Sequence, residues 1–562
     1  MNELFSRLRA RPALFLELSV ASLLINLLAF ADTIFVMILL RRYLAYGFDA
    51  TLLVLTCGTL VALAMQYGLS RVRVALAAQV GPARERAAAE ALFAGLAGAR
   101  VDALEALPPG RTVEAAQDLE AVRAAHDGTN LVALLDAPFS LLFVAAAWAL
   151  SPLIALVVLL GMALSLWAAE NTVRRQGDAS RDLAAARTEN RGLMLSANTA
   201  ADTLRAFSAL RHYGALWRGQ SARLAALRRR IADTRGLGQA VSGAAGLSVR
   251  VGVYAVGAVL VVRGELTFAA LIGASILGGY AVQRVVGLAA ARSLLAEAAA
   301  ARARLDELEA LPAERRDGEK PASYAGGLCT ENLSFAFPGG AAPLFGGVNL
   351  DLPPGGLLVV RGFNGCGKST LLRLLAGLLE PSTGHIAAGG LALSRWDLAH
   401  WRRQLCYLPQ EPYFLAGTVR DNLVMANPDL PEVRLNALIR ACGLRRWLDL
   451  SEKGLDTPMN DGGRDLPLGI RRRMAWVRAL AGEGPLLLLD EPTEGLDAEG
   501  VQAVYALLND LLREGRTMVA VSADPAILRA AHLVLDLGAS PAPALAVQRP
   551  LAAPAAGPEE KP

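Results

Sequence analysis

Residues 356–370 read GLLVVRGFNGCGKST, and this stretch decides the fold of the C-terminal half of the chain. Its apolar start predicts a buried strand, its glycines predict a tight loop, and the run LLRLLAGLL that follows predicts a helix. In this context, backbone N–H groups and the helix N-terminus close on phosphate oxygens. We therefore expect a nucleotide to be bound by Gly362, Asn364, Gly365, Cys366, Gly367, Lys368, Ser369 and Thr370.

Two side chains of this loop carry separate chemistry. The Lys368 ammonium supplies positive charge to the β- and γ-phosphates, and the Ser369 hydroxyl offers an oxygen ligand to Mg²⁺. The loop therefore predicts a nucleotide that is bound together with a divalent cation.

A second stretch, PLLLLDE at 485–491, is an apolar strand that ends in two acids. Asp490 is expected to hold Mg²⁺, directly or through water, and Glu491 to polarise the attacking water. The alternative is a buried strand with two capping acids and no catalytic part. The order and spacing of the two motifs disfavour that alternative and predict an α/β P-loop domain that hydrolyses ATP.

The first 290 residues are much more apolar than the rest, and they contain runs long enough to cross a bilayer, which takes about 20 residues per helix. Six spans are predicted, at about 14–40, 51–70, 131–150, 152–169, 240–262 and 267–289. The overall hydrophobic fraction of 54% and mean hydropathy of +0.36 agree with a membrane protein.

Loop lengths and arginines predict the orientation of these spans. Ser151-Pro152 and residues 263–266 make tight corners, whereas the segments 71–130 and 170–239 are long and predicted to be helical. The second long segment is rich in arginine, which places both segments and the N-terminus in the cytoplasm. Within them, 113–126 and 198–212 are candidate coupling helices, with plain solvated helix faces as the alternative.

Asp32 and Asp136 lie inside apolar runs, where a charge by default suggests function. The interpretation that we favour is a structural role near a helix end or a wet cavity. The net charge of +4 is small for 562 residues and does not indicate a partner nucleic acid. The five cysteines have no paired spacing, which indicates reduced thiols.

Composition divides the chain into four parts. Residues 1–311 are predicted to form the transmembrane domain, 312–325 a polar linker, and 326–538 the ATP-binding domain. The Pro- and Ala-rich segment 539–562 is predicted to be a disordered tail.

Apart from that tail, the chain resembles the half-transporters of ABC exporters, in which a six-helix membrane domain precedes an ABC ATPase domain. The resemblance assigns adenine stacking to Phe337, in ENLSFAFPGG, and the Q-loop to Gln410, in LCYLPQEP. Gln410 would then sense Mg²⁺ and contact the membrane domain. Glu494–Asp497 matches the D-loop, which crosses the dimer interface.

Within the exporters, the chain is most similar in look to the permease/ATPases of type I secretion systems. The stretches that carry this likeness are DATLLVLTCGTLVAL, LLDAPFSLLFVAAAWAL, LTFAALIGASILGGYAV and GLDTPMNDGGRDL. The likeness implies export of a protein or peptide across a bacterial inner membrane, with a periplasmic adaptor and an outer-membrane channel as partners. Export of a lipid or small molecule stays open as an alternative.

Two departures from the family pattern concern the ATPase site. The signature Leu-Ser-Gly-Gly-Gln is replaced by Leu466-Pro467-Leu468-Gly469-Ile470, and the switch histidine is replaced by Ala523. Pro467 has neither a hydroxyl nor an N–H, and Leu468 adds bulk where the backbone must approach the γ-phosphate. We therefore expect a second half-transporter as partner, in a heterodimer rather than a homodimer. A regulatory subunit with little turnover is the competing hypothesis.

Overall fold

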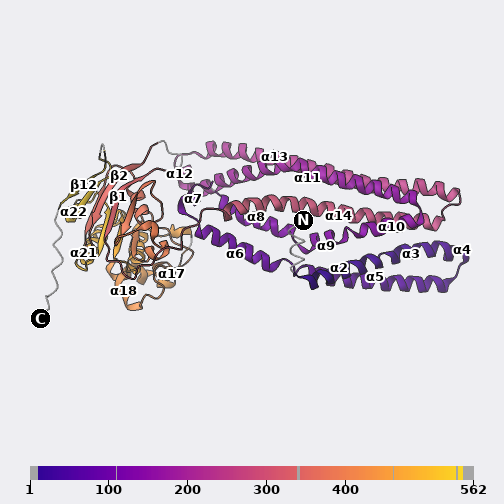
Figure 1. The fold of residues 1–562 in the computed structure, drawn as a ribbon, viewed down its shortest axis with the longest axis horizontal. Helices are drawn as coiled ribbons and strands as arrows, with labels where there is room; N and C mark the ends of the chain where they lie inside the picture. The colour runs from indigo at the N-terminus through magenta and orange to yellow at the C-terminus, as the bar shows by residue number, and fades with distance from the viewer. Residues whose placement is uncertain (1–10, 109, 338–341, 460, 540–541, 549–562) are drawn as a thin grey trace. The chain divides into compact units, whose positions relative to one another are not determined.

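The computed structural model describes residues 11–108, 110–337, 342–459, 461–539 and 542–548. The chain divides into two compact units. The helical unit comprises residues 1–98 and 105–311, and the sheet unit comprises residues 99–104 and 312–562 (Figure 1).

In the residues that the structure describes, the helical unit is built of helices. They are α2 (Pro12–Leu28), α3 (Phe30–Ile38), the π-helical turn η1 (Leu39–Tyr43), α4 (Leu44–Tyr46), α5 (Asp49–Ala77), α6 (Pro82–Gly98), α8 (Arg111–Ala125), α9 (Gly128–Asp136), α10 (Phe139–Leu150), α11 (Pro152–Thr199), α12 (Ala201–Ala206), α13 (Leu210–Val262) and α14 (Phe268–Glu309). The short helix α7 (Val101–Glu105) begins in the sheet unit.

Six helical stretches of the described chain are long and apolar enough to cross a membrane, which confirms the predicted six-helix domain. They are Pro12–Tyr43, Asp49–Ala77, Arg111–Leu150, Pro152–Thr199, Leu210–Val262 and Phe268–Glu309. The first five predicted spans lie within one stretch each, and the sixth, 267–289, begins one residue before its helix, at the N-cap Thr267. A proline at the first position of a helix costs no backbone bond, so α11 starts directly at Pro152 after the corner at Ser151.

The long segment predicted between the fourth and fifth spans is helical over most of its length. With 48 and 53 residues, α11 and α13 are roughly 70 and 80 Å long, about twice what a bilayer requires. They run side by side (Figure 1). At Gly161 a Cβ would lie 1.9 Å from Cγ2 of Val249, so the small residue permits this close approach.

A buried polar cluster connects four helices of the helical unit. Asp136, which is 4% exposed, accepts hydrogen bonds from Arg73 Nη1 at 2.8 Å and Asn26 Nδ2 at 3.2 Å. Arg284 Nη1 lies 3.8 Å from the same carboxylate. Asp32 accepts a hydrogen bond from the Tyr280 hydroxyl at 3.2 Å. Both acids therefore have partners on other helices, as a structural role requires.

The sheet unit contains two larger sheets and a small ribbon. The strands are β1 (Leu328–Phe335), β2 (Phe345–Leu352), β3 (Leu357–Arg361), β4 (Thr383–Ala388), β5 (Leu391–Ala392), β6 (Leu405–Leu408), β7 (Gly417–Thr418), β8 (Pro458–Met459), β9 (Leu486–Asp490), β10 (Thr517–Val521), β11 (Leu533–Asp536) and β12 (Ala544–Val547). The first sheet is antiparallel, in the order β2-β1-β4-β5, and the ribbon pairs β7 with β8.

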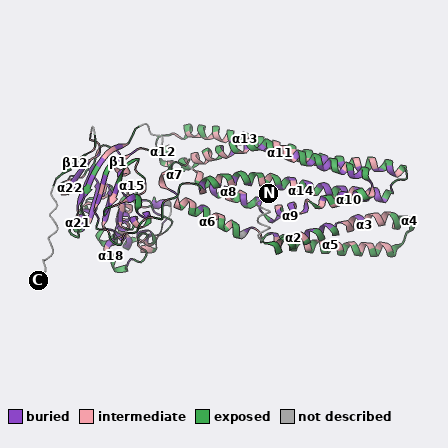
Figure 2. Ribbon diagram, viewed as in Figure 1, coloured by how far each residue is buried: buried purple, intermediate pink, exposed green. Residues whose placement is uncertain are grey.

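The second sheet has the order β12-β11-β3-β10-β9-β6, and all of its pairs are parallel except the one at β12. Its buried strands are marked purple in Figure 2. The helices of the unit are α15 (Lys368–Leu375), α16 (Leu398–Arg402), α17 (Val419–Leu423), α18 (Glu432–Ala441), α19 (Arg445–Leu450), α20 (Leu468–Ala481), α21 (Ala498–Arg513) and α22 (Pro525–Ala530), with 3-10 turns η2 (Leu393–Arg395), η3 (Gly454–Asp456) and η4 (Asp461–Gly463). Parallel strands end at one edge, so the segments that follow β3, β9 and β10 meet there.

Two stretches differ from their predicted character. In the tail predicted to be disordered, residues 544–547 form β12, which pairs antiparallel with β11, so the backbone N–H and C=O groups at this edge of the sheet are hydrogen-bonded. Residues 540–541 and 549–562 of that tail lie outside the described residues. The segment predicted as a linker, 312–325, packs on the sheet unit through ion pairs from Glu314 to Arg402 and from Glu319 to Arg395.

Asp136→Asn tests the buried cluster. Removing one partner of a buried ion pair leaves a charge uncompensated, so we expect the free energy of unfolding to fall by about 3–5 kcal/mol. The double variant Arg73→Gln/Asp136→Asn should cost less than the sum of its single changes. Thermal unfolding of the detergent-solubilised chain measures both, and Asp233→Asn, which breaks only an exposed pair with Arg229, is the control. Additive losses would contradict the coupling.

Candidate functional site

The loop after β3 has the geometry of a phosphate cradle. Gly367 has a φ of 101° and caps α15, and a Cβ there would lie 2.7 Å from the Phe345 ring, so only glycine fits. The Lys368 ammonium folds back across the loop, where it donates to the carbonyl oxygens of Gly362 at 3.0 Å and Phe363 at 3.2 Å. The Lys368 ammonium thus places a positive charge over the loop.

The remaining predicted residues of this loop follow its path. Gly362 and Gly365 also have positive φ angles, of 149° and 88°. Residues other than glycine adopt such angles only at a cost in free energy, so glycine suits this turn. Asn364 lies between them, Cys366 is buried beneath the loop, and Thr370 lies in the first turn of α15. The structure therefore gathers the predicted phosphate-binding residues in one loop.

Asp490 ends β9 directly beside this loop. Its side chain accepts a hydrogen bond from the Ser369 hydroxyl, but its Oδ1 is buried with no hydrogen-bond partner in the described chain. Burial raises the pKa of the Asp490 carboxyl above its ordinary value. A buried carboxylate oxygen without a partner, next to a hydroxyl, fits a hard cation such as Mg²⁺.

The described residues contain no cluster of three or more His, Cys, Asp or Glu side chains that could hold a metal ion. This is compatible with Mg²⁺, because protein sites for this ion commonly use one or two side chains and take the other ligands from phosphates and water. Ser369 and Asp490 would be those two side chains.

Glu491 is held in a strained backbone conformation. Its φ of 46° lies in the left-handed region, and its N–H donates to the Val521 carbonyl at 3.0 Å. Burial raises the pKa of the Glu491 carboxyl above its ordinary value, with Asp490 and Glu494 as further causes. Strain and a raised pKa in a carboxylate at a phosphate loop are typical of a group that handles a proton or a water.

Gln410 and Phe337 lie on separate segments of the sheet unit. Gln410 follows β6, and its amide donates to Glu494 Oε2 at 3.5 Å. Phe337 follows β1 and contacts Phe335 edge-on, with ring centroids 5.0 Å apart. Its side chain is 47% exposed, which leaves a ring face open for stacking.

Arg472 is a residue of this site that the sequence argument did not single out. It is 4% exposed, and its Nη2 lies 3.0 Å from Glu494 Oε2 while Nη1 donates to the Pro409 carbonyl at 3.3 Å. It therefore connects α20 to both the segment of Gln410 and the segment of Glu494. Its signal in the sequence is periodicity, because Arg472 shares a helix face with the buried residues Ala475, Trp476 and Ala479.

The departures from the signature change the start of α20. Pro467 caps this helix without a side-chain hydrogen bond. The side chain of Leu468 is 48% exposed and packs on Gly495, where a Cβ would lie 2.9 Å from Leu468 Cδ2. Beside it, a cavity of about 320 Å³ is lined by Gln410, Tyr413, Arg464, Leu468, Arg471 and Glu494, among others.

At the position of the switch histidine, Ala523 offers no polar side chain. The next residue, Asp524, caps α22 and accepts hydrogen bonds from Tyr505 Oη at 2.6 Å and Thr493 Oγ1 at 3.3 Å. Burial opposes a charge on Asp524, yet these hydrogen bonds and the helix N-terminus hold its pKa below the ordinary value. This carboxylate is therefore engaged by protein groups and remains ionised.

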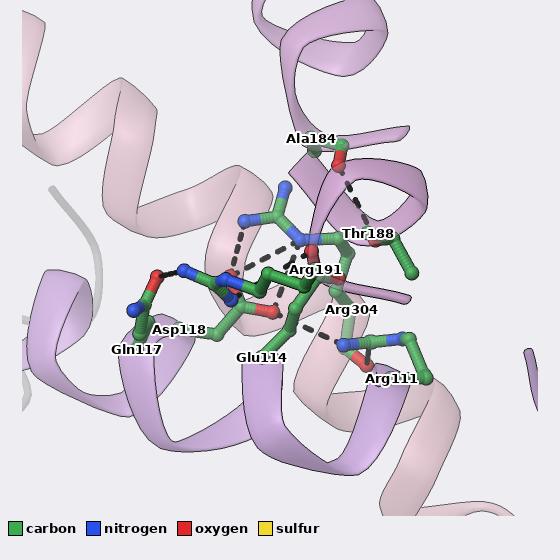
Figure 3. Close-up of polar contacts among 8 residues, drawn as sticks. All are labelled: Arg111, Glu114, Gln117, Asp118, Ala184, Thr188, Arg191 and Arg304. Carbon is green, nitrogen blue, oxygen red and sulfur yellow. Dashed lines mark hydrogen bonds and ion pairs between the residues drawn. The ribbon is translucent and has the colours of Figure 1, made fainter. Parts of the chain in front are cut away.

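A second polar cluster lies in the helical unit, around the predicted coupling segment 113–126 (Figure 3). Arg304 on α14 donates from Nε to both oxygens of Asp118 on α8, at 3.2 and 3.1 Å. Arg111 Nη2 donates to the Arg304 carbonyl at 2.6 Å, and Arg191 on α11 donates to Gln117. These contacts join α8 to α14 and α11. The other predicted segment, 198–212, contains α12.

In the comparisons with known proteins, each of the two units matches a family model of its own. Residues 15–280 match the family model of the ABC transporter transmembrane region, and residues 345–494 match the ABC transporter model. The type I secretion system ATP-binding protein PrsD of Rhizobium meliloti (strain 1021) is 28% identical over 530 residues, which cover 94% of this chain and 90% of the relative.

Two further comparisons extend this similarity. The alpha-hemolysin translocation ATP-binding protein HlyB of Proteus vulgaris is 25% identical over 91% of this chain and 72% of its own length. The structure of a bacterial Atm1-family ABC exporter with ATP bound superimposes with a TM-score of 0.82 over 93% of this chain and 94% of that chain. At 17% identity, the latter likeness shows a shared fold.

Arg472→Gln tests whether this arginine fixes the segments of Gln410 and Glu494. Losing charged hydrogen bonds from a buried guanidinium should lower the free energy of unfolding by about 1–2 kcal/mol. Glu494→Gln should cost less because its side chain is half exposed, and the double variant should cost little more than Arg472→Gln alone. Thermal unfolding by scanning fluorimetry measures these shifts, with exposed Arg513→Gln as the control. Equal stability of Arg472→Gln and wild type would contradict this role.

The raised pKa of Glu491 predicts a pH dependence. The ordinary pKa of glutamate is 4.5, and a protonated carboxyl does not polarise water, so ATP hydrolysis should fall with decreasing pH already above this value. Initial rates measured between about pH 5 and pH 8 give the profile. Glu491→Gln should remove this acidic limb together with most of the rate. A wild-type rate that stays constant down to about pH 5 would argue against Glu491 as the base.

Proposed function

The chain is an ABC exporter half-transporter, a transmembrane region fused to an ATP-binding domain, and from this premise we propose that it exports a polypeptide in a type I secretion-like system. The observation that carries the proposal is similarity over nearly the whole chain to PrsD, which is named a type I secretion protein. The similarity to HlyB, named for translocation of alpha-hemolysin, agrees with it.

In this proposal the sheet unit provides the ATPase site, with residues 326–538 as the ATP-binding domain. Lys368 neutralises the β- and γ-phosphates, Ser369 and Asp490 hold Mg²⁺ with a contribution from Gln410, and Phe337 stacks on adenine. Glu491 polarises the attacking water. The support is geometric, since the loop follows β3, and the unpartnered Asp490 oxygen and strained Glu491 lie at the end of β9, both at the same edge of one parallel sheet in which β10 separates the two strands.

The partners in this proposal are a second half-transporter, a periplasmic adaptor and an outer-membrane channel. The membrane would be the bacterial inner membrane, with the ATP-binding domain in the cytoplasm. Six spans and an even number of crossings agree with one side for the N-terminus and the ATP-binding domain.

A second candidate is a regulatory half with little turnover of its own. Three positions favour it: Pro467 and Leu468 stand in the signature, and Ala523 stands at the switch position. Leu468 covers Gly495 with an apolar side chain, and Asp524 is already engaged by Tyr505 and Thr493. Such a chain would give its own phosphate loop to a partner that carries an intact signature.

ATP turnover of the purified chain in lipid nanodiscs separates the two candidates. An active exporter should hydrolyse ATP with Mg²⁺ present, and Glu491→Gln should reduce the rate by roughly 10²-fold or more, because the water loses its base. Lys368→Ala, which removes the charge from the cradle, should instead abolish ATP binding. Where turnover appears only beside a second ABC half-transporter, its loss with Glu491→Gln would identify this chain as an active half of a heterodimer, and its persistence would identify this chain as the regulatory half.

A further inference from the structure

A charged cavity lies between α11, α13 and α14 of the helical unit. Its volume is about 370 Å³, within the range of roughly 300–1,000 Å³ that ligand sites occupy. Among the side chains that the structure describes, five arginines and one carboxylate contribute to its lining, namely Arg181, Arg187, Arg228, Arg235, Arg304 and Glu297. The three helices therefore gather an excess of positive charge around one hollow.

Protein groups engage part of this charge. Arg235 Nη2 lies 2.9 Å from Glu297 Oε2, and Arg304 is bound by Asp118 in the cluster of Figure 3. Arg187 is different, because its burial lowers the pKa of its guanidinium, the nearby charge of Arg228 lowers this pKa further, and Glu297 compensates less. Two like charges that line one hollow favour an anion bound between them.

An unpartnered buried amide lines the same cavity. Gln176 on α11 is 6% exposed, and its Nε2 has no hydrogen-bond partner in the described chain. A buried N–H donor without an acceptor costs about 1–3 kcal/mol. A carboxylate in the cavity would supply that acceptor, so the Gln176 amide and the arginines would bind the same kind of group.

The length of the cavity distinguishes between two sources of anions. Its lining on α11 runs from Val173 to Arg187, which is roughly 21 Å along a helix. The apolar run of α11 ends near residue 169, and the headgroup layer of a bilayer is only roughly 5–8 Å thick on each side. A lipid headgroup beside Val173, at the end of the cavity that is nearer to the apolar run, would therefore not reach Arg187. An extended polypeptide would reach it.

We propose that this cavity binds acidic side chains of the exported polypeptide, with Arg187, Arg228 and the Gln176 amide as its recognition groups. The inference rests on the proposed polypeptide export and adds the substrate class, an acidic segment. Guanidinium groups bind carboxylates with charge-assisted hydrogen bonds, which are selective for geometry and sensitive to salt.

Binding of a fluorescein-labelled decaglutamate to the full chain in nanodiscs, followed by anisotropy, tests the proposal. We expect Arg187→Gln/Arg228→Gln to weaken binding at least about tenfold, since two charged contacts are lost. Arg187→Lys/Arg228→Lys should retain most of the affinity. Arg229→Gln is the matched control, because this neighbour on α13 is exposed and pairs only distantly with Asp233. A decaglutamine peptide should not bind.

Equal affinity of the wild type and the double glutamine variant would overturn the proposal. So would loss of peptide binding when phosphatidylglycerol replaces phosphatidylcholine in the nanodisc, because lipid headgroups would then occupy the arginines. ATP turnover is measured in the same samples. Peptide binding that depends on Arg187 and Arg228 supports the cavity even where turnover is absent, whereas turnover without such binding overturns the cavity alone.

Discussion

An ionised carboxylate that is buried without a full set of partners costs free energy, and Asp490 is such a group at the end of β9. The parallel pairing of β3, β10 and β9 brings this carboxylate to the phosphate loop. The leucines of β9 bury the strand and so force Asp490 inward at its end. The apolar packing that buries β9 therefore also fixes the position of the Asp490 carboxylate at the edge of the sheet.

The helical unit also contains a buried carboxylate, Asp136, but its hydrogen-bond partners differ from those of Asp490. Asp136 is as buried as Asp490, but Arg73, Asn26 and Arg284 from three other helices satisfy it. A satisfied cluster fixes the packing of helices, whereas an unsatisfied oxygen is free for a ligand. This difference in partners separates a structural acid from a candidate functional one.

The sequence predicted the features that depend on local pattern. The phosphate loop, the strand before Asp490 and the six spans each follow from contiguous residues, and the structure has all of them. It did not predict the ion pair of Arg472 with Glu494, since 22 residues and the fold of α20 separate the two. Nor did it predict β12, because this four-residue edge strand, with the sequence ALAV, is too short to show a pattern of its own and forms against β11.

Thiol reactivity follows from the burial of the sheet unit. Burial raises the pKa of Cys442 to about 12, and it also raises the pKa of Cys406 and of Cys329. Cys366 is 4% exposed under the phosphate loop. Because the thiolate is the form that reacts with maleimides and oxidants, the raised pKa values of Cys442, Cys406 and Cys329 and the burial of Cys366 make these thiols slow to react. A single cysteine introduced at its surface would then accept a spectroscopic label without removal of the native thiols of this unit, whereas the exposed Cys57 of the helical unit would have to be replaced.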